Sequence, residues 1–176
     1  MNIKIIGAVA GVMLCATTAI GKESISNNEA RERYCMAEAI LFEAGNQPLA
    51  GKVAVGEVIM NRVRSKKYPS TVCGVVHQGP ISSWWKKKHN KIVPVRNRCQ
   101  FSYYCDGKSD NITRWEKTHT WTDVLKATIY VMTTDVEISK FNLTNGATHY
   151  HATYVTPHWS RYLQQTVRIE DHIFYK

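Results

Sequence analysis

Glu43 is the residue of this sequence whose setting best suits acid catalysis. It ends an apolar helical pattern that places Met36, Ala39 and Ile40 on the same face. The pair Gly45-Asn46 follows and should break that helix. A carboxyl that leaves an apolar helix end is partly removed from water, and desolvation raises its pKa. A raised pKa suits a general acid near neutral pH, although most glutamates at helix ends are ordinary surface residues.

A second group of polar and aromatic side chains lies in the last forty residues. His149 and His151 flank Tyr150, so both imidazoles would share one face of a strand, and His158 and Trp159 follow closely. Two such histidines could bind zinc and, with an acid, would indicate an exported metallo-amidase or peptidase. No H-E-x-x-H motif or comparable ligand set accompanies them, so we expect no metal and no cofactor. We expect His149, Tyr150 and Trp159 to bind substrate in a groove instead.

A small set of helices and strands must position these side chains. Apolar spacing predicts helices over 34–44, 49–63 and 122–134, and short strands over 147–150, 167–169 and 173–175. Apolar residues nearly surround the second helix, which should therefore be the central buried element. Residues 64–98 show no regular pattern, and a compact loop bounded by cysteines follows at 99–105. The predicted fold class is α+β: one mainly helical, lysozyme-sized domain with a small late sheet.

Composition and charge narrow the class of protein. The chain has 176 residues, of which 44% are hydrophobic and 21% charged, which excludes long disorder, coiled coils and polytopic membrane proteins. The net charge is +9. Between Val58 and Cys105 there are ten Lys and Arg and no Asp or Glu, so this span should attract polyanions. For Lys86–Lys88 alone a solvated loop is the simpler interpretation; for the whole span we expect an anionic envelope surface rather than nucleic acid.

The N-terminus carries a pattern typical of export. Lys4 is followed by seventeen uncharged residues, Ile5–Gly21, which make roughly 25 Å of helix, slightly short of a bilayer core. Residues 1–22 are either a cleaved signal peptide or a weak anchor, held transiently in the membrane, that resembles the signal-anchor-release segments of phage endolysins. We expect residues 23–33 to form a linker, residues 34–176 the catalytic domain, and the protein to act in the periplasm or outside the cell, tethered to the membrane before release in the second case.

Export changes how the cysteines are interpreted. Cys15 lies in the leader, whereas Cys35, Cys73, Cys99 and Cys105 form an even set that favours two disulfides in an oxidising compartment. The spacing suggests a local Cys99–Cys105 bridge and a long Cys35–Cys73 bridge, the latter closing about 39 residues and stabilising the fold by roughly 3–4 kcal/mol. A zinc site is the alternative, but no C-x-x-C pair supports it.

Five blocks of the sequence together resemble one protein family. They are Leu41–Val63, Tyr68–Val76, Cys99–Gly107, Gly146–His151 and His172–Tyr175. In this order they are similar to the SleB/CwlJ-type cell wall hydrolase domain, found in spore-cortex-lytic enzymes and in bacterial and phage lysis proteins. The resemblance covers nearly all of the chain after the expected leader and linker, and it implies a fold like that of lysozymes and lytic transglycosylases.

The resemblance implies cleavage of peptidoglycan between N-acetylmuramic acid and N-acetylglucosamine. One essential glutamate opens the family's E-A-R-G-E-P motif, and it corresponds to Glu43. The sequence then departs from the motif: Gly45 stands for the arginine, Asn46 for the glycine and Gln47 for the second glutamate. Glu43 is therefore the only carboxylate of the block.

This departure bears on the mechanism. Retaining and inverting glycosidases use two carboxyl groups, so a distant partner would be required; Glu57, fourteen residues further on, is the nearest candidate, and Asp106 and Asp123 are others. A lytic transglycosylase needs only one, which acts first as acid and then as base. We therefore expect a lytic transglycosylase. A hydrolytic muramidase, a zinc-dependent wall amidase and a non-catalytic wall-binding module are the alternatives.

The loop between the last two cysteines also matches the family. Gln100, Phe101 and Ser102 correspond to its Q-F-S, and we expect them to line the substrate groove, although Phe101 is equally suited to the core. We expect a structural role for Arg62, in solvent or in an ion pair. His172 either stacks near the site or closes the sheet, and we favour the structural role.

Overall fold

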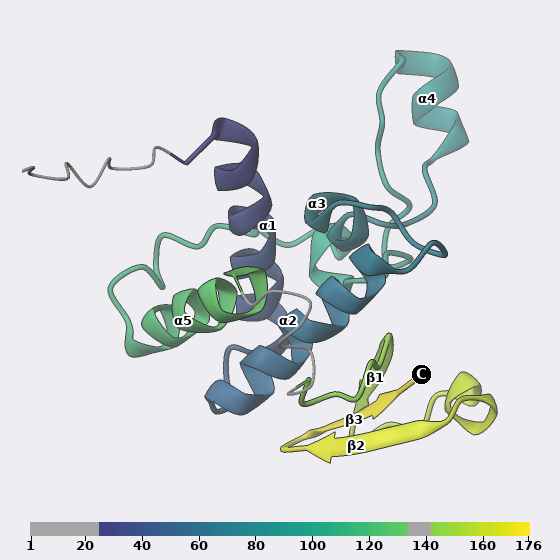
Figure 1. The fold of residues 1–176 in the computed structure, drawn as a ribbon. Coiled ribbons are helices and arrows are strands. Elements are labelled where there is room, and N and C mark those ends of the chain that lie inside the picture. Colours follow the sequence, from purple (N-terminus) through teal and green to yellow (C-terminus); the bar gives the residue numbers. More distant parts are fainter. Residues whose placement is uncertain (1–24, 134–141) are drawn as a thin grey trace, which may run out of the picture.

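The computed structural model describes residues 25–133 and 142–176 (Figure 1). The expected leader with Cys15, and the end of the third expected helix at residue 134, lie outside these ranges. The elements are α1 (Asn27–Ala44), α2 (Leu49–Arg64), α3 (Val72–Val76), α4 (Ser83–His89), η1 (Ser102–Cys105), α5 (His119–Thr133), β1 (His149–Ala152), η3 (His158–Tyr162), β2 (Gln165–Ile169) and β3 (His172–Tyr175).

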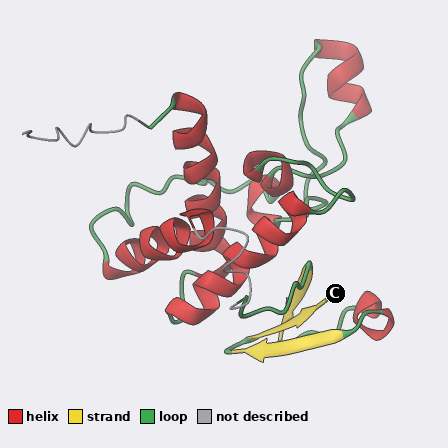
Figure 2. Cartoon of the chain, in the orientation of Figure 1, coloured by secondary structure: helices red, strands yellow, loops and turns green. Residues whose placement is uncertain are grey.

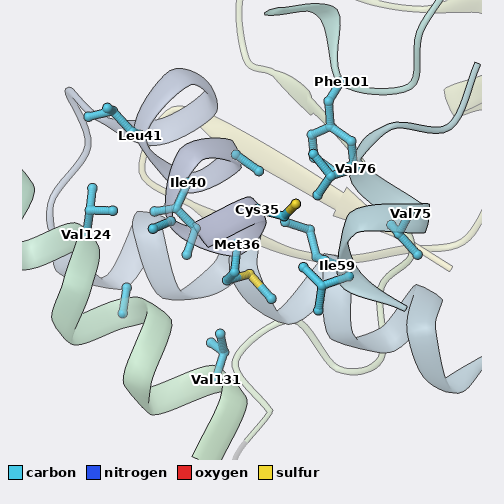
Figure 3. Close-up of a cluster of buried hydrophobic side chains, with 14 of the residues drawn as sticks. Cys35, Met36, Ile40, Leu41, Ile59, Val75, Val76, Phe101, Val124 and Val131 are labelled. Carbon is cyan, nitrogen blue, oxygen red and sulfur yellow. The ribbon is translucent and has the colours of Figure 1, made fainter. Parts of the chain in front are cut away.

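The helices enclose the main core, and α2 lies at its centre. Helix α2 contacts α1, α3 and α5, and it also reaches the sheet at β2. Figure 3 shows the buried side chains that α1 and α5 direct toward one another, among them Met36, Ile40 and Val131. A Cβ added at Gly56 would lie 3.0 Å from Val131 and 3.1 Å from Ile40, so this glycine allows α2 to approach both neighbours. The expectation of a central, buried second helix is confirmed.

The strands form one antiparallel sheet of order β1-β3-β2, which follows the five described α-helices along the chain, with the short helix η3 between β1 and β2 (Figure 2). In the register of β1 on β3, Tyr150 pairs with Phe174. Phe174 is fully buried and packs with Ala54 and Val58 of α2. The sheet is thereby fixed on the opposite side of α2 from the main core, and the predicted α+β fold class is confirmed.

Two segments are more ordered than the sequence pattern predicted. Helix α1 begins at Asn27, inside the expected linker, because Ser26 accepts a hydrogen bond from the Glu29 amide (3.2 Å) and Arg33 pairs with Glu29 (2.7 Å) one turn apart. Polar residues with good caps continue a helix even without apolar spacing. Within the expected irregular span 64–98, α3 and α4 are short helices, each with a side-chain cap at its start.

Both expected disulfides are present. Cys35–Cys73 joins α1 to α3, and Cys99–Cys105 closes the loop that contains η1. Within residues 25–133 and 142–176, no helix combines the length and the hydrophobicity needed to cross a membrane.

Candidate active site

A cleft of about 440 Å³ lies where the end of α1 meets the Cys99–Cys105 loop and the sheet. Four regions that are distant in sequence contribute to it: α1, α2, the Cys99–Cys105 loop and the C-terminal segment from β1 to β3. Its lining consists of Phe42, Glu43, Arg62, Gln100, Ser102, His149, Tyr150, His151, Ala152, Tyr154, Val155, Trp159 and His172. Most of the residues that the sequence analysis selected are therefore brought together at one place.

Glu43 projects into this cleft from the last turn of α1. The Tyr150 hydroxyl donates a hydrogen bond to its Oε2 (3.0 Å), and the backbone of Ser102 also favours the ionised form of the same carboxyl. Burial raises the pKa of Glu43 above its ordinary value, while the Tyr150 hydrogen bond, the Ser102 backbone and the Arg62 charge partly offset that rise. The carboxyl is thus held in one orientation and kept protonated to a higher pH than a surface glutamate.

Tyr150 lies on β1, at one edge of the sheet, and packs against the cluster that joins Phe174 to α2. Its ring lies edge-on to His172 (5.2 Å between ring centroids) and 5.8 Å from that of Phe174. Burial and the neighbouring Glu43 carboxyl raise the pKa of Tyr150 well above its ordinary value. The phenol therefore stays protonated and acts as a hydrogen-bond donor to Glu43.

Arg62 supplies the positive charge of the site. Its side chain is only 4% exposed, its Nε donates to the Thr148 carbonyl (2.7 Å), and its guanidinium lies over the rings of Tyr68 and Phe101. Desolvation lowers the pKa of Arg62, but a guanidinium remains charged in proteins. The buried Nη1 has no hydrogen-bond partner among the described residues. This charge favours the ionised form of Glu43.

The three residues of the Cys99–Cys105 loop that match the family do not all face the cleft. Gln100 and Ser102 line the cleft, as expected. Phe101 is 1% exposed and belongs to the main core beneath the Arg62 guanidinium. Its ring supports the charged wall of the site instead of facing the groove.

The late histidines have different surroundings. His149 lines the cleft beside Trp159, with ring centroids 5.5 Å apart. His151 is buried; its Nδ1 donates to the Ala152 carbonyl (2.9 Å), and its Nε2 shares a hydrogen bond with the Tyr175 hydroxyl (2.9 Å). Both nitrogens of His151 are therefore engaged. Across residues 25–133 and 142–176, no three His, Cys, Asp or Glu side chains gather as a metal site.

Glu57, the nearest candidate for a second carboxylate, is not brought to Glu43. It is buried in α2, and its two oxygens accept the backbone amides of residues 143–144, each at 3.0 Å. Asp106 and Asp123 form ion pairs with nearby lysines and do not line the cleft. Among the described residues that line the cleft, Glu43 is the single acidic side chain.

Gln47, which stands where the resemblance places a second glutamate, has a structural role. Its Nε2 donates to the Asp171 carboxylate (3.1 Å), and its Oε1 accepts the Asp171 amide (3.3 Å). Its carbonyl accepts a hydrogen bond from Lys52. Gln47 therefore fixes the turn before β3 against the corner between α1 and α2.

Two lining residues were assigned structural roles from the sequence. Arg62 was expected in solvent or in an ion pair, but it is buried and bonds the Thr148 carbonyl. It follows Val58 and Ile59 at helical spacing, and this position on the buried face of α2 could have predicted its burial. His172 is buried at the start of β3, and only the register of β1 on β3 brings it to Tyr150. No local pattern of the sequence contains that pairing.

Comparison with known proteins places this geometry in context. The profile of a family described as cell wall hydrolase matches residues 46–175, beginning three residues after Glu43. A spore cortex-lytic enzyme of Bacillus cereus is 46% identical over 43 residues, which cover 24% of this chain and 17% of the relative. One of Bacillus subtilis is 40% identical over 53 residues, covering 30% and 16%. The aligned segments thus span less than a fifth of these relatives' length.

Two solved structures share the fold. The catalytic domain of the germination-specific lytic transglycosylase SleB from Bacillus anthracis superposes with a TM-score of 0.57 and 26% identity, covering 86% of this chain and 96% of that domain. The catalytic domain of the Bacillus cereus SleB protein gives 0.53 and 24%, covering 90% and 100%, and supports the fold alone.

Proposed function

The chain belongs to the cell wall hydrolase family, and we propose that it is a lytic transglycosylase that cuts peptidoglycan between N-acetylmuramic acid and N-acetylglucosamine. The family match and the shared fold confirm the resemblance predicted from the sequence blocks. The observation that carries the proposal is the Glu43 carboxyl, which is partly buried, is held by Tyr150 and faces a cleft.

In the first step Glu43 acts as a general acid. Its raised pKa increases the fraction of Glu43 that carries a proton when a glycosidic oxygen comes within hydrogen-bond reach. Transfer of that proton to the oxygen breaks the bond to C1 of the muramic acid residue, and the N-acetylglucosamine end leaves as an alcohol. Positive charge develops at C1 while Glu43 becomes a carboxylate.

In the second step the same carboxylate acts as a base. It takes the proton from the C6 hydroxyl of the muramic acid residue, whose oxygen bonds to C1 and closes a 1,6-anhydro ring. Glu43 is protonated again, so no water is consumed and no group remains on the enzyme. The Tyr150 hydroxyl, the Ser102 backbone and the Arg62 charge stabilise the carboxylate between the two steps.

The composition of the cleft favours this route over hydrolysis. Hydrolytic glycosidases place two carboxyl groups about 5–9.5 Å apart. Among the described lining residues only Glu43 is acidic, and Glu57 is occupied with two backbone amides. An intramolecular hydroxyl as nucleophile needs no second carboxylate to activate water.

The remaining lining residues suit a glycan. Trp159 and Tyr154 offer aromatic faces to sugar rings, and the Gln100 amide can donate to and accept from an acetamido group. His149 has a pKa lowered by burial and by the Arg62 charge, so it acts as a neutral hydrogen-bonding group.

We place the enzyme outside the cytoplasm, in the periplasm or beyond the cell. Two disulfides in a domain of this size support an oxidising compartment. The apolar segment within residues 1–22 supports export, either as a cleaved signal peptide or as an anchor that later leaves the membrane.

Digestion of purified sacculi, followed by mass spectrometry of the released muropeptides, tests the function. We expect anhydro-muramic ends, about 18 Da lighter than hydrolysed ends because water is not added. Glu43→Gln should release nothing. Hydrolysed ends would instead indicate a muramidase, release of stem peptides that EDTA abolishes would indicate a zinc amidase, and binding without products would indicate a wall-binding module.

A further inference from the structure

Residues 81–94, here called the α4 hairpin, extend away from the other helices (Figure 1). The hairpin is closed at its base by an isolated bridge between Ile81 and Pro94 and by the hydrogen bond from the Ser82 amide to the Val93 carbonyl (2.9 Å). Asn90, in the left-handed conformation, ends α4 and turns the chain back. The segment is therefore a defined projection with both ends anchored.

The α4 hairpin exposes large apolar side chains that the core does not use. All seven residues of α4 are exposed, including Trp84 (53%) and Trp85 (37%). Their rings contact each other edge to face, with centroids 4.9 Å apart. Ile81 and Ile92, at 42% and 79% exposure, add two aliphatic side chains on the two arms. Such a concentration of exposed apolar surface marks an interaction site.

Positive charge accompanies these side chains. Lys86, Lys87 and Lys88 follow the two tryptophans directly, and Lys91 lies just after the turn. The Lys88 ammonium lies 5.1 Å from the centroid of the Trp84 ring. The α4 hairpin contains no acidic residue, and neither does the rest of the sequence between Val58 and Cys105. Its charge is thus not neutralised within the projection.

We propose that the α4 hairpin docks the protein on a lipid bilayer that contains anionic phospholipid. Tryptophan is favoured at the headgroup level, exposed isoleucine gains by entering the acyl boundary, and clustered lysines are attracted to anionic headgroups. The exposed isoleucines favour a bilayer over a glycan or a nucleic acid, because an aliphatic side chain gains little from a sugar face or a phosphate backbone. This surface goes beyond the proposed catalytic function and uses none of its cleft residues.

The base of the α4 hairpin is connected to the Cys99–Cys105 loop. The backbone N–H of Gln100 donates to the backbone carbonyl of Gln78 (2.8 Å). This hydrogen bond joins the segment before the hairpin to the loop that carries Ser102. Docking through the hairpin would therefore fix the cleft relative to the membrane surface. That consequence depends on the proposed function, whereas docking itself does not.

Quenching of tryptophan fluorescence by brominated lipid tests the docking with the full chain. The probe is vesicles of brominated phosphatidylcholine with or without phosphatidylglycerol. Residues 1–22 contain no tryptophan, so binding through the N-terminal segment alone gives no quenching. We expect quenching with phosphatidylglycerol present, and its loss in Trp84→Phe/Trp85→Phe.

Two variants that each lose three lysines, one within the α4 hairpin and one outside it, test whether docking needs the charge of the hairpin. Lys86→Gln/Lys87→Gln/Lys88→Gln should raise the lipid concentration for half-maximal quenching on the order of 100-fold. The matched control Lys108→Gln/Lys117→Gln/Lys176→Gln removes the same charge elsewhere and should change it little. Equal effects of the two triple variants would overturn the proposal, because they would indicate attraction by net charge alone.

Two further outcomes would also overturn the docking proposal. One is an absence of quenching in the wild type; the other is quenching that persists in Trp84→Phe/Trp85→Phe. Release of muropeptides from lipid-free sacculi is measured on the same proteins, and the hairpin variants should retain it. Muropeptide release without docking would overturn only the docking proposal, and docking without muropeptide release would overturn only the proposed function.

Discussion

The hydroxyl of Tyr150 lies 3.0 Å from Oε2 of Glu43, although the two residues are 107 positions apart in the chain. The helix that carries Glu43 and the strand that carries Tyr150 meet only because β1 and β3 pack on α2 through Phe174. The orientation of the Glu43 carboxyl thus depends on the tertiary fold, and replacing Tyr150 by phenylalanine removes the hydroxyl that holds it.

Tyr150→Phe should lower kcat roughly 10- to 100-fold, because a hydrogen bond to a charged group contributes about 1.5–3 kcal/mol. The Tyr150 hydrogen bond lowers the pKa of Glu43, so its loss raises that pKa further. Activity that requires protonated Glu43 should then persist to higher pH. The pH profile of muropeptide release measures both effects. Tyr162→Phe, at an exposed tyrosine outside the cleft, should change neither; a downward shift for Tyr150→Phe would contradict the assigned role.

Glu43→Gln should abolish activity and change the pH dependence of stability. Burial raises the pKa of Glu43 in the folded state, so the folded protein binds more protons than the unfolded one above about pH 4, the ordinary glutamate pKa. The free energy of unfolding of the wild type therefore falls as the pH rises from about 4 to the raised pKa of Glu43 in the folded state. The Gln variant lacks this loss, so its stability relative to wild type should increase across that interval. Urea denaturation at a series of pH values measures the difference.

Glu38→Gln is the matched control for this experiment. Glu38 also lies on α1, and burial also raises its pKa, but it does not line the cleft. Its replacement should relieve the same kind of pH-dependent loss while leaving muropeptide release intact. Inactivity of the Glu38 variant, or a Glu43 variant whose relative stability does not rise with pH, would count against the proposed division between a catalytic and a merely buried carboxyl.

The sequence predicted those parts of the structure that local patterns specify. Apolar spacing located α2 to within one residue of its end, and the turn residues after Glu43 located the end of α1. The beginning of α1 was missed because it depends on a cap and an ion pair among polar residues, not on apolar periodicity. Local capping interactions are visible in a sequence, but they are weaker than the apolar pattern that delimits an element.

The parts of the site that depend on distant pairing could not be predicted. The environment of Arg62 is set by the Thr148 carbonyl, 86 residues away, and that of Glu57 by a turn at a similar separation. A charged residue on a buried helix face signals only that some partner must exist. Which partner it finds, and whether it faces a cleft, follows from how the sheet packs on α2.

Glu57→Gln should destabilise the fold without removing activity. One amide oxygen can replace only one of the two carboxylate oxygens that accept the amides of Leu143 and Thr144, so one buried donor loses its partner at a cost of about 1–3 kcal/mol. Muropeptide release per folded molecule should match wild type. The exposed Glu116→Gln serves as control and should alter neither quantity. Loss of activity at unchanged stability would make Glu57 the second carboxylate and favour the hydrolytic mechanism.

The two disulfides should separate stability from activity. Cys35→Ala/Cys73→Ala opens a bridge with a separation of 38 residues and should cost about 4 kcal/mol, against about 2 kcal/mol for the separation of six in Cys99→Ala/Cys105→Ala. The loss of activity per folded molecule should be larger for Cys99→Ala/Cys105→Ala than for Cys35→Ala/Cys73→Ala. The short bridge constrains the loop whose Gln100 and Ser102 line the cleft beside Glu43, whereas the long bridge joins α1 to α3 away from the cleft lining.

Urea denaturation and muropeptide release, measured on the same preparations, test this order. The Cys99/Cys105 variant should lose most of its kcat while it remains folded, because the loop no longer holds the Ser102 backbone against the carboxyl. The Cys35/Cys73 variant should keep wild-type activity per folded molecule at temperatures below its lowered Tm. If both variants lost activity only in proportion to unfolding, the Cys99–Cys105 loop would have no part in orienting Glu43, and Tyr150 would be its sole essential support among the described residues.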